Sequence, residues 1–319
     1  MRSFAACLLL WIASCAAVDG SAARATVTDR ATARGPRVLV VIAHPDDETA
    51  FAGALYKVTT HLDGVCDVLV ITNGEGGFKY ATLAERIYGV ELTDERVGRA
   101  ELPAIRRREL IEGARVLGVR RIEFLAERDH RYTTDLAEVL GPDARVWDLA
   151  RIRAALARAL ADEPYDFVFA LRPTATTHAH HQAATRLARE AVLATPASRR
   201  PALLIGSVSS PSQPSESPTS PDGVDLPAPT FHFDRLQSFG FQSKLDYRVV
   251  VNWEIAAHKS QGTMQLAMNR GEREDFALWG TESEADVAAA TELFRRLAEP
   301  QFESKTYGAS AGTNAEAKR

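Results

Sequence analysis

The segment Ala43-His-Pro-Asp-Asp-Glu48 places one histidine beside three acids. At a turn between a strand and a helix, His44 and Asp47 can both reach one cation. Zinc accepts imidazole nitrogen and carboxylate oxygen, and catalytic zinc sites usually keep one position open for water or substrate. The carboxylate of Asp46 would then be free to move a proton. The alternative is an ordinary helix start, where acids offset the positive end of the helix dipole, but the histidine favours a metal.

His178, His180 and His181 fall within four residues and make up three of the eight histidines in the chain. One of them would complete a ligand set of two histidines and one carboxylate with His44 and Asp47. A histidine cluster can also be a solvated surface group. The spacing alone does not select one of the three as the ligand.

The segments that must position these residues alternate between two patterns. Continuous apolar, β-branched runs predict strands covered on both faces at 37–43, 67–72, 121–125 and 166–171. Apolar residues at helical spacing predict helices around 51–58, 98–117, 152–160 and 183–191. This alternation predicts an α/β fold with a Rossmann-like, doubly wound and mostly parallel sheet.

All the candidate residues follow predicted strands. His44 comes after the first strand, and Glu75 lies in the glycine-rich turn after the second. Asp129 follows the third strand, and the histidines at 178–181 follow the fourth. Ligands of doubly wound sheets bind beyond the carboxyl ends of the strands. We therefore expect these residues to meet in one site.

The 319 residues predict one main domain at 36–300 with a C-terminal α/β extension. A strand at 247–251 and helices near 252–268 and 284–298 make up the extension. The segment 207–230 is rich in proline and serine, which predicts a flexible insertion. Residues 307–319 are expected to form a disordered tail.

The first 25 residues predict an export signal. Arg2 precedes an apolar run at 4–12 that is too short to span a bilayer, and small residues follow it. Ile12-Ala-Ser-Cys15 is similar to a bacterial lipobox, which would lipidate Cys15 and attach the protein to a membrane. A conventional cut within 13–25 is the alternative. We expect a periplasmic or membrane-anchored protein of a bacterium.

The composition gives no sign of a nucleic-acid partner. The net charge is −4 and the isoelectric point is about 6.1, so the chain lacks the basic character of a nucleic-acid-binding protein. Outside the first 25 residues the only cysteine is Cys66, which stands in an apolar strand pattern. It is predicted to be a buried, inert thiol rather than half of a disulfide.

The sequence resembles the LmbE-like, or PIG-L, family of zinc-dependent N-deacetylases. The segment from Ala43 to Glu48 matches the family signature A-H-P-D-D-E in full, directly after the first strand. Further likenesses are found at 71–77, at 108–110 with 117–119, and at 257–261. The resemblance therefore extends over roughly residues 37–261.

The resemblance implies a role for each matching residue. His44, Asp47 and His181 are implied to bind zinc, with Asp46 as the general base. His178, the first histidine of the family motif H-x-D-H, is implied to stabilise the transition state.

The segment from His178 to His181 departs from the family motif H-x-D-H at one position, because His180 stands where the family has an acid. That acid is thought to orient or charge the first histidine, so the protonation state of His178 is left open. Glu75, Asp129 and His180 are weaker candidates for contact with the substrate. A glycine-rich turn explains Glu75 without any ligand.

These inferences predict a zinc-dependent hydrolase that removes the acetyl group from an N-acetylglucosamine-type substrate, releasing acetate and a free amine. One alternative is a deacylase of a non-sugar amide. Another is a metal-bearing glycan-binding protein without turnover, which Asp46 opposes because a structural zinc site needs no spare base. A two-metal phosphoesterase is disfavoured, because too few further His and Asp residues stand in suitable places.

Overall fold

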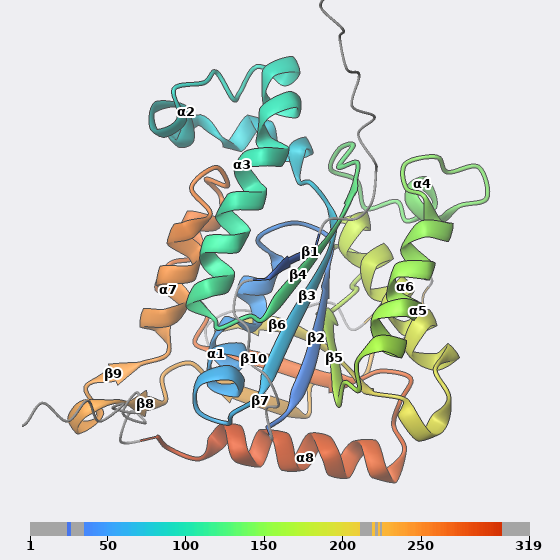
Figure 1. The fold of residues 1–319 in the computed structure, drawn as a ribbon, viewed down its shortest axis with the longest axis vertical. Helices are drawn as coiled ribbons and strands as arrows, with labels where there is room; N and C mark the ends of the chain where they lie inside the picture. The colour runs from blue at the N-terminus through green and yellow to red at the C-terminus, as the bar shows by residue number, and fades with distance from the viewer. Residues whose placement is uncertain (1–23, 27–34, 211–218, 221–222, 224, 302–319) are drawn as a thin grey trace, which may run out of the picture.

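The computed structural model describes residues 24–26, 35–210, 219–220, 223 and 225–301. Its centre is one eight-stranded sheet in the order β1-β4-β3-β2-β5-β6-β10-β7 (Figure 1). The strands are β1 (Arg24–Thr26), β2 (Arg37–Ile42), β3 (Val65–Thr72), β4 (Arg121–Glu127), β5 (Phe167–Leu171), β6 (Ala202–Ser209), β7 (Phe231–Asp234) and β10 (Arg273–Leu278). A small separate ribbon pairs β8 (Ser238–Phe239) with β9 (Leu245–Asp246).

The five strands β4, β3, β2, β5 and β6 run parallel, whereas β1, β10 and β7 pair antiparallel at the edges. The chain first builds outward from β2 through β3 to β4 and then returns to the other side of β2 with β5. This reversal makes the space beyond the carboxyl ends of β2 and β5 a topological switch point, where doubly wound sheets bind ligands. The predicted fold class is confirmed.

Helices cover both faces of the sheet. The face with α1 (Ala52–Thr60), α3 (Glu95–Val116), α7 (Arg248–Ala257) and α8 (Glu284–Ala298) encloses one apolar core, and the face with α5 (Leu149–Asp162) and α6 (Ala179–Ala194) encloses another (Figure 1). The shorter helices are η1 (Asp47–Phe51), η2 (Glu75–Tyr80), α2 (Thr82–Tyr88), α4 (Ala137–Leu140), η3 (Ala197–Arg199), η4 (Phe241–Ser243) and η5 (Met264–Ala267).

Strand β2 shows why an unbroken apolar run forms a central strand. Val38, Val40 and Ile42 pack into the first core, whereas Leu39 and Val41 pack into the second. Alternate side chains point to opposite faces, so a strand between two helical layers needs apolar residues at every position.

The C-terminal part differs from the prediction in two respects. Residues 248–251 begin helix α7 rather than forming a strand at 247–251. Val250 and Val251 are buried in the core, and this packing outweighs the small helix penalty of β-branched residues. In addition, β10 and β7 extend the main sheet beyond β6, and β6 continues to Ser209, so the first residues of the predicted 207–230 insertion belong to the sheet.

Most of the predicted signal (1–25) and the predicted tail (307–319) lie outside the described residues. Strand β1 includes Arg24 and Ala25 and pairs with β4, so a cut before Arg24 would leave the strand intact. Within the described ranges, no helix combines the length and apolar character needed to cross a membrane. Cys66 is a free, fully buried thiol as predicted, and burial raises its pKa.

Candidate metal and active site

The turn after β2 brings His44, Asp46 and Asp47 to the carboxyl end of the sheet. The backbone N–H groups of Asp46 and Asp47 both donate to the carbonyl oxygen of His44, at 3.0 and 3.3 Å. Asp47 Oδ2 accepts from the backbone N–H groups of Ala43 at 3.0 Å and His44 at 2.8 Å. These bonds hold the Asp47 carboxylate and leave Oδ1 available to another group.

His44, Asp47 and His181 bring three potential ligand atoms together. His44 Nδ1 lies 2.9 Å from His181 Nε2 and 3.7 Å from Asp47 Oδ2, and His181 Nε2 lies 3.1 Å from Asp47 Oδ1. A tetrahedral zinc ion with ligand bonds of about 2.0–2.1 Å would separate its ligand atoms by about 3.3 Å. The three residues therefore fit a zinc ion in spacing and in chemistry.

The charges around these residues are strongly coupled. Burial disfavours the charged form of His44, but the nearby carboxylates of Asp47 and Asp129 raise its pKa to about 9. Burial also opposes ionisation of Asp47, yet His181 and His44 hold its pKa well below the usual range. Neighbouring positive charge therefore stabilises the Asp47 carboxylate, and a bound metal ion would supply such a charge.

Asp46 lies half-buried beside this group without joining it. Burial, and then the negative charge of Asp47, raise the pKa of Asp46 to about 6. The charges of His258, His44 and Arg106 act in the opposite direction. A carboxylate with such a pKa is ionised at neutral pH yet basic enough to accept a proton, as a general base must be.

His178 stands at the N-terminal cap of α6, two residues before His180. Its ring stacks on His44 with centroids 5.0 Å apart and on Tyr132 with centroids 5.1 Å apart. Its Nε2 lies 3.0 Å from the carbonyl oxygen of Arg131, to which it donates. Burial lowers the pKa of His178 to about 3, so the ring is neutral at pH 7 and its one N–H is already engaged.

His180 and Asp129 both lie against His44. His180 Nδ1 is 3.2 Å from His44 Nε2 and 3.3 Å from Asp129 Oδ1, and His180 Nε2 is 2.9 Å from His130 Nδ1. Asp129 Oδ2 accepts from the backbone N–H of Gly76 at 3.1 Å and lies 3.9 Å from His44 Nε2. Burial lowers the pKa of His180 to about 4.

Glu75 begins η2, next to Gly76, whose backbone N–H donates to Asp129. Glu75 is buried, and burial raises its pKa. Arg106 of α3 stabilises this turn, because it donates to the carbonyl oxygen of Gly74 and, at 3.3 Å, to that of Gly77. Arg106 is itself buried. Hydrogen bonds from a buried side chain therefore fix the glycine-rich turn beside the site.

Glu48 does more than begin a helix. Its Oε1 lies 2.9 Å from His258 Nε2, which also lies 2.9 Å from Glu254 Oε1. All three side chains are fully buried. Nearby, Gln261 donates to the carbonyl oxygen of Pro45. The 257–261 segment thus ties α7 to the turn that carries His44 and Asp47.

A cavity of about 490 Å³ opens beside Asp47 and His181. The C-terminal part of the chain forms much of its wall. The other lining residues are Thr49, Ala50, Leu171, Arg172, Thr177, Gly206, Ser207, Val208, Arg235, Ile255, Met264, Leu266, Ala267, Arg270 and Gly271. A substrate in this cavity would contact the two ligand candidates directly.

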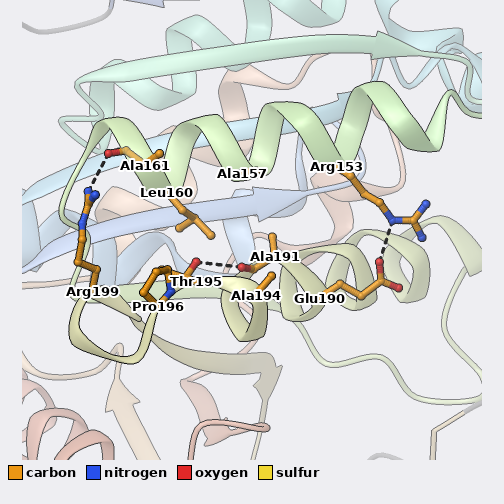
Figure 2. Close-up of a pocket in the computed structure, with 10 residues that line it drawn as sticks. All are labelled: Arg153, Ala157, Leu160, Ala161, Glu190, Ala191, Ala194, Thr195, Pro196 and Arg199. Carbon is orange, nitrogen blue, oxygen red and sulfur yellow. Dashed lines mark hydrogen bonds and ion pairs between the residues drawn. The ribbon is translucent and has the colours of Figure 1, made fainter.

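A second cavity, of about 570 Å³, lies between α5 and α6 (Figure 2). Arg153 and Glu190 on its rim pair with each other at 2.9 Å, and Arg199 donates to the carbonyl oxygen of Ala161. None of the candidate residues lines it. Its polar groups are bonded locally, so it offers no group for chemistry.

The structure thus brings all the predicted site residues together beyond the carboxyl ends of the parallel strands. Sequence reasoning missed His130, although it directly follows Asp129. It also missed the cavity wall formed by segments 206–208 and 264–271, because these residues carry no motif and only the fold brings them beside His181.

Residues 39–192 match the PIG-L family, described as GlcNAc-PI de-N-acetylase. The chain carries a PIG-L domain. The predicted family is therefore confirmed, and so, at the level of the family, is the prediction of a hydrolytic N-deacetylase. The PIG-L domain contains every predicted site residue, whereas the cavity wall at 206–271 lies beyond the matched residues.

Several solved structures are similar to this chain. N,N'-diacetylchitobiose deacetylase from Pyrococcus horikoshii is 19% identical with a TM-score of 0.49, covering 77% of this chain and 84% of that chain. The 4-carboxy-2-hydroxymuconate hydratase of Pseudomonas putida is 17% identical with a TM-score of 0.49, covering 78% and 98%. A deacetylase of teicoplanin biosynthesis is 15% identical with a TM-score of 0.48, covering 77% and 100%. No curated protein matches the sequence.

Proposed function

We propose that this protein is a zinc-dependent hydrolase that removes the acetyl group from an N-acetylglucosamine-type substrate, releasing acetate and a free amine. The observation that carries the proposal is the convergence of His44, Asp47 and His181 beside the separate carboxylate of Asp46. A purely structural metal site has no need of this additional acid. The PIG-L domain supports the bond type.

The ligand residues and the base have separate tasks. His44 Nδ1, His181 Nε2 and a carboxylate oxygen of Asp47 would hold the zinc ion. Zinc bound there would polarise the amide carbonyl and make water more acidic. Asp46 would accept the proton of the attacking water at its carboxylate and deliver it to the departing amine.

His178 is proposed to stabilise the transition state, a role that requires a ring N–H free to donate a hydrogen bond. Its Nε2–H is donated to the carbonyl oxygen of Arg131. A hydrogen bond to the developing oxyanion therefore requires either release of that bond or a second proton on Nδ1.

The cavity also favours a second candidate, deacylation of an amide with an apolar, non-sugar group. Leu171, Val208, Ile255 and Leu266 line the cavity beside the proposed metal ligands. Such a wall suits an aliphatic or aromatic group better than a sugar ring with its many hydroxyls.

The test is release of acetate or a longer acid from a panel of N-acetyl sugars, N-acetyl amino acids and longer N-acyl amines. The wild type is compared with Asp46→Asn and with the exposed control Asp143→Asn. We expect zinc to remain bound in all three proteins and turnover to be lost only in Asp46→Asn. Full activity of Asp46→Asn would overturn the mechanism, and cleavage confined to non-sugar amides would favour the second candidate.

We further propose that the protein is exported. The support is the sequence of the first 25 residues, with a basic start, a short apolar run and the lipobox-like segment ending at Cys15. Labelling with a radioactive fatty acid in a bacterial host, with and without Cys15→Ser, tests lipidation. Label in the wild type alone would support a lipid anchor, and export without label would support a conventional cut.

A further inference from the structure

Three histidines and a glutamate form a continuous line of contacts that leads away from the proposed metal site. His44 Nε2 lies 3.2 Å from His180 Nδ1, and His180 Nε2 lies 2.9 Å from His130 Nδ1. His130 Nε2 in turn lies 3.2 Å from Glu138 Oε2. His180 is fully buried, whereas the side chain of Glu138 is 27% exposed. The line therefore runs from the core of the site toward the surface.

The end of this line determines the direction of every hydrogen bond in it. An ionised carboxylate only accepts, so His130 must donate to Glu138 from Nε2. A neutral imidazole has one donor and one acceptor, so His130 Nδ1 then accepts from His180 Nε2. By the same rule, His180 Nδ1 accepts from His44 Nε2.

This direction leaves Nδ1 of His44 as the nitrogen that can bind a metal. It is the same nitrogen that lies 2.9 Å from His181 Nε2 and 3.7 Å from Asp47 Oδ2. Histidines that bind metals generally donate their other N–H to a fixed partner, which sets the tautomer and the ring orientation. The contacts of His44 follow this pattern.

Asp129 provides the competing arrangement, because its Oδ1 lies 3.3 Å from His180 Nδ1. If His180 donated to Asp129, it would have to accept from His130, and a neutral His130 would then have no hydrogen for Glu138. Within the described residues, Asp129 Oδ1 makes no hydrogen bond of acceptable geometry. The structure therefore favours donation from His44 to His180.

We propose that His180 is the positioning residue for His44: it accepts the Nε2–H of His44 at Nδ1 and is itself held by His130 and Glu138. This inference rests on the proposed metal site. It also gives a reason for the departure from the family motif. An ionised aspartate at position 180 would accept from His44, but it would have no hydrogen to donate to His130.

The first experiment reads the tautomers directly. Nitrogen-15 NMR of the wild-type protein, labelled at histidine and loaded with zinc, distinguishes protonated from unprotonated ring nitrogens. We expect hydrogen on Nε2 and none on Nδ1 in both His44 and His180. A hydrogen on Nδ1 of His180 would overturn the proposal. The tautomer of His180 is also read in the zinc-free protein, so failure to bind zinc would overturn the proposed function separately.

The second experiment compares zinc affinity, measured by competition with a chelator, in two matched variants. His180→Asn places an amide oxygen near the position of Nδ1, and His180→Gln reaches only the position of Nε2. We expect His180→Asn to bind zinc within about threefold of wild type and His180→Gln to bind about 10–100-fold more weakly. Equal affinities for the two variants would overturn the proposal. Circular dichroism of the zinc-free proteins checks that both are folded.

Discussion

Asp47 Oδ1 lies 3.1 Å from His181 Nε2, although the two residues come from opposite ends of the PIG-L domain. Asp47 follows β2, and His181 lies in the first turn of α6 after β5. Because β2 and β5 are parallel neighbours, their carboxyl ends meet at the switch point. The order of the strands therefore brings the proposed metal ligands together. Each ligand can be tested by its own substitution.

His181→Ala should lose zinc. The variant keeps only His44 and Asp47, and two ligands hold zinc much more weakly than three. The measurement is the zinc content of purified protein after dialysis, with the exposed His232→Ala as control. Unchanged zinc in His181→Ala would move the third ligand to His178 or His180.

Zinc affinity should increase with pH. The pKa of His44 is raised to about 9 in the metal-free protein, so below that pH a proton must leave before the ring can bind zinc. We expect the apparent affinity to rise by up to about tenfold per pH unit between pH 6 and pH 8. Zinc competition at several pH values measures this, and an affinity independent of pH would contradict it.

Activity should require the ionised form of Asp46. The pKa of this carboxyl is raised to about 6, and the protonated acid cannot accept a proton. We therefore expect kcat/KM to fall as pH drops through about 6, and zinc, as a nearby positive charge, would shift that limb to lower pH. A rate that increases steadily down to pH 4 would be inconsistent with Asp46 as the base.

His258→Ala should destabilise the fold. The substitution removes the imidazole that contacts both Glu48 and Glu254 and leaves their fully buried carboxyl groups without that partner. Breaking such a buried group typically costs about 3–5 kcal/mol. Urea unfolding of the zinc-free protein measures the change, and a loss below about 1 kcal/mol would show that the cluster is not needed for stability.

Filling the cavity beside the metal site should weaken substrate binding. Ala267→Trp would occupy part of the 490 Å³ cavity, and we expect KM to increase more than about tenfold while zinc stays bound. Ala157→Trp is the matched control, because Ala157 lines the separate cavity between α5 and α6. Equal effects of the two variants would mean that the first cavity does not hold the substrate.

Much of the fold was predictable from local pattern. The strands β2 to β5 and helices such as α3 and α6 were found because a buried strand must be apolar throughout and a half-buried helix must be apolar at every third or fourth residue. The apolar run at 248–251 was wrongly predicted to be a strand, because valines pack equally well in a helix when a core covers them. Strand β7 is the edge strand of the sheet, and β10 contains the buried acids Glu274 and Asp275, so neither strand shows a continuous apolar run.

The sequence by itself determined the residue types of the site, because His44, Asp46 and Asp47 stand in one short segment whose chemistry can be read directly. Only the tertiary structure decided which neighbours these residues have. It placed His181 at the ligand set, His180 between His44 and His130, and the segment at 264–271 along the cavity. Motifs record residues that are close along the chain, whereas distances between distant segments depend on how the strands are ordered in the sheet.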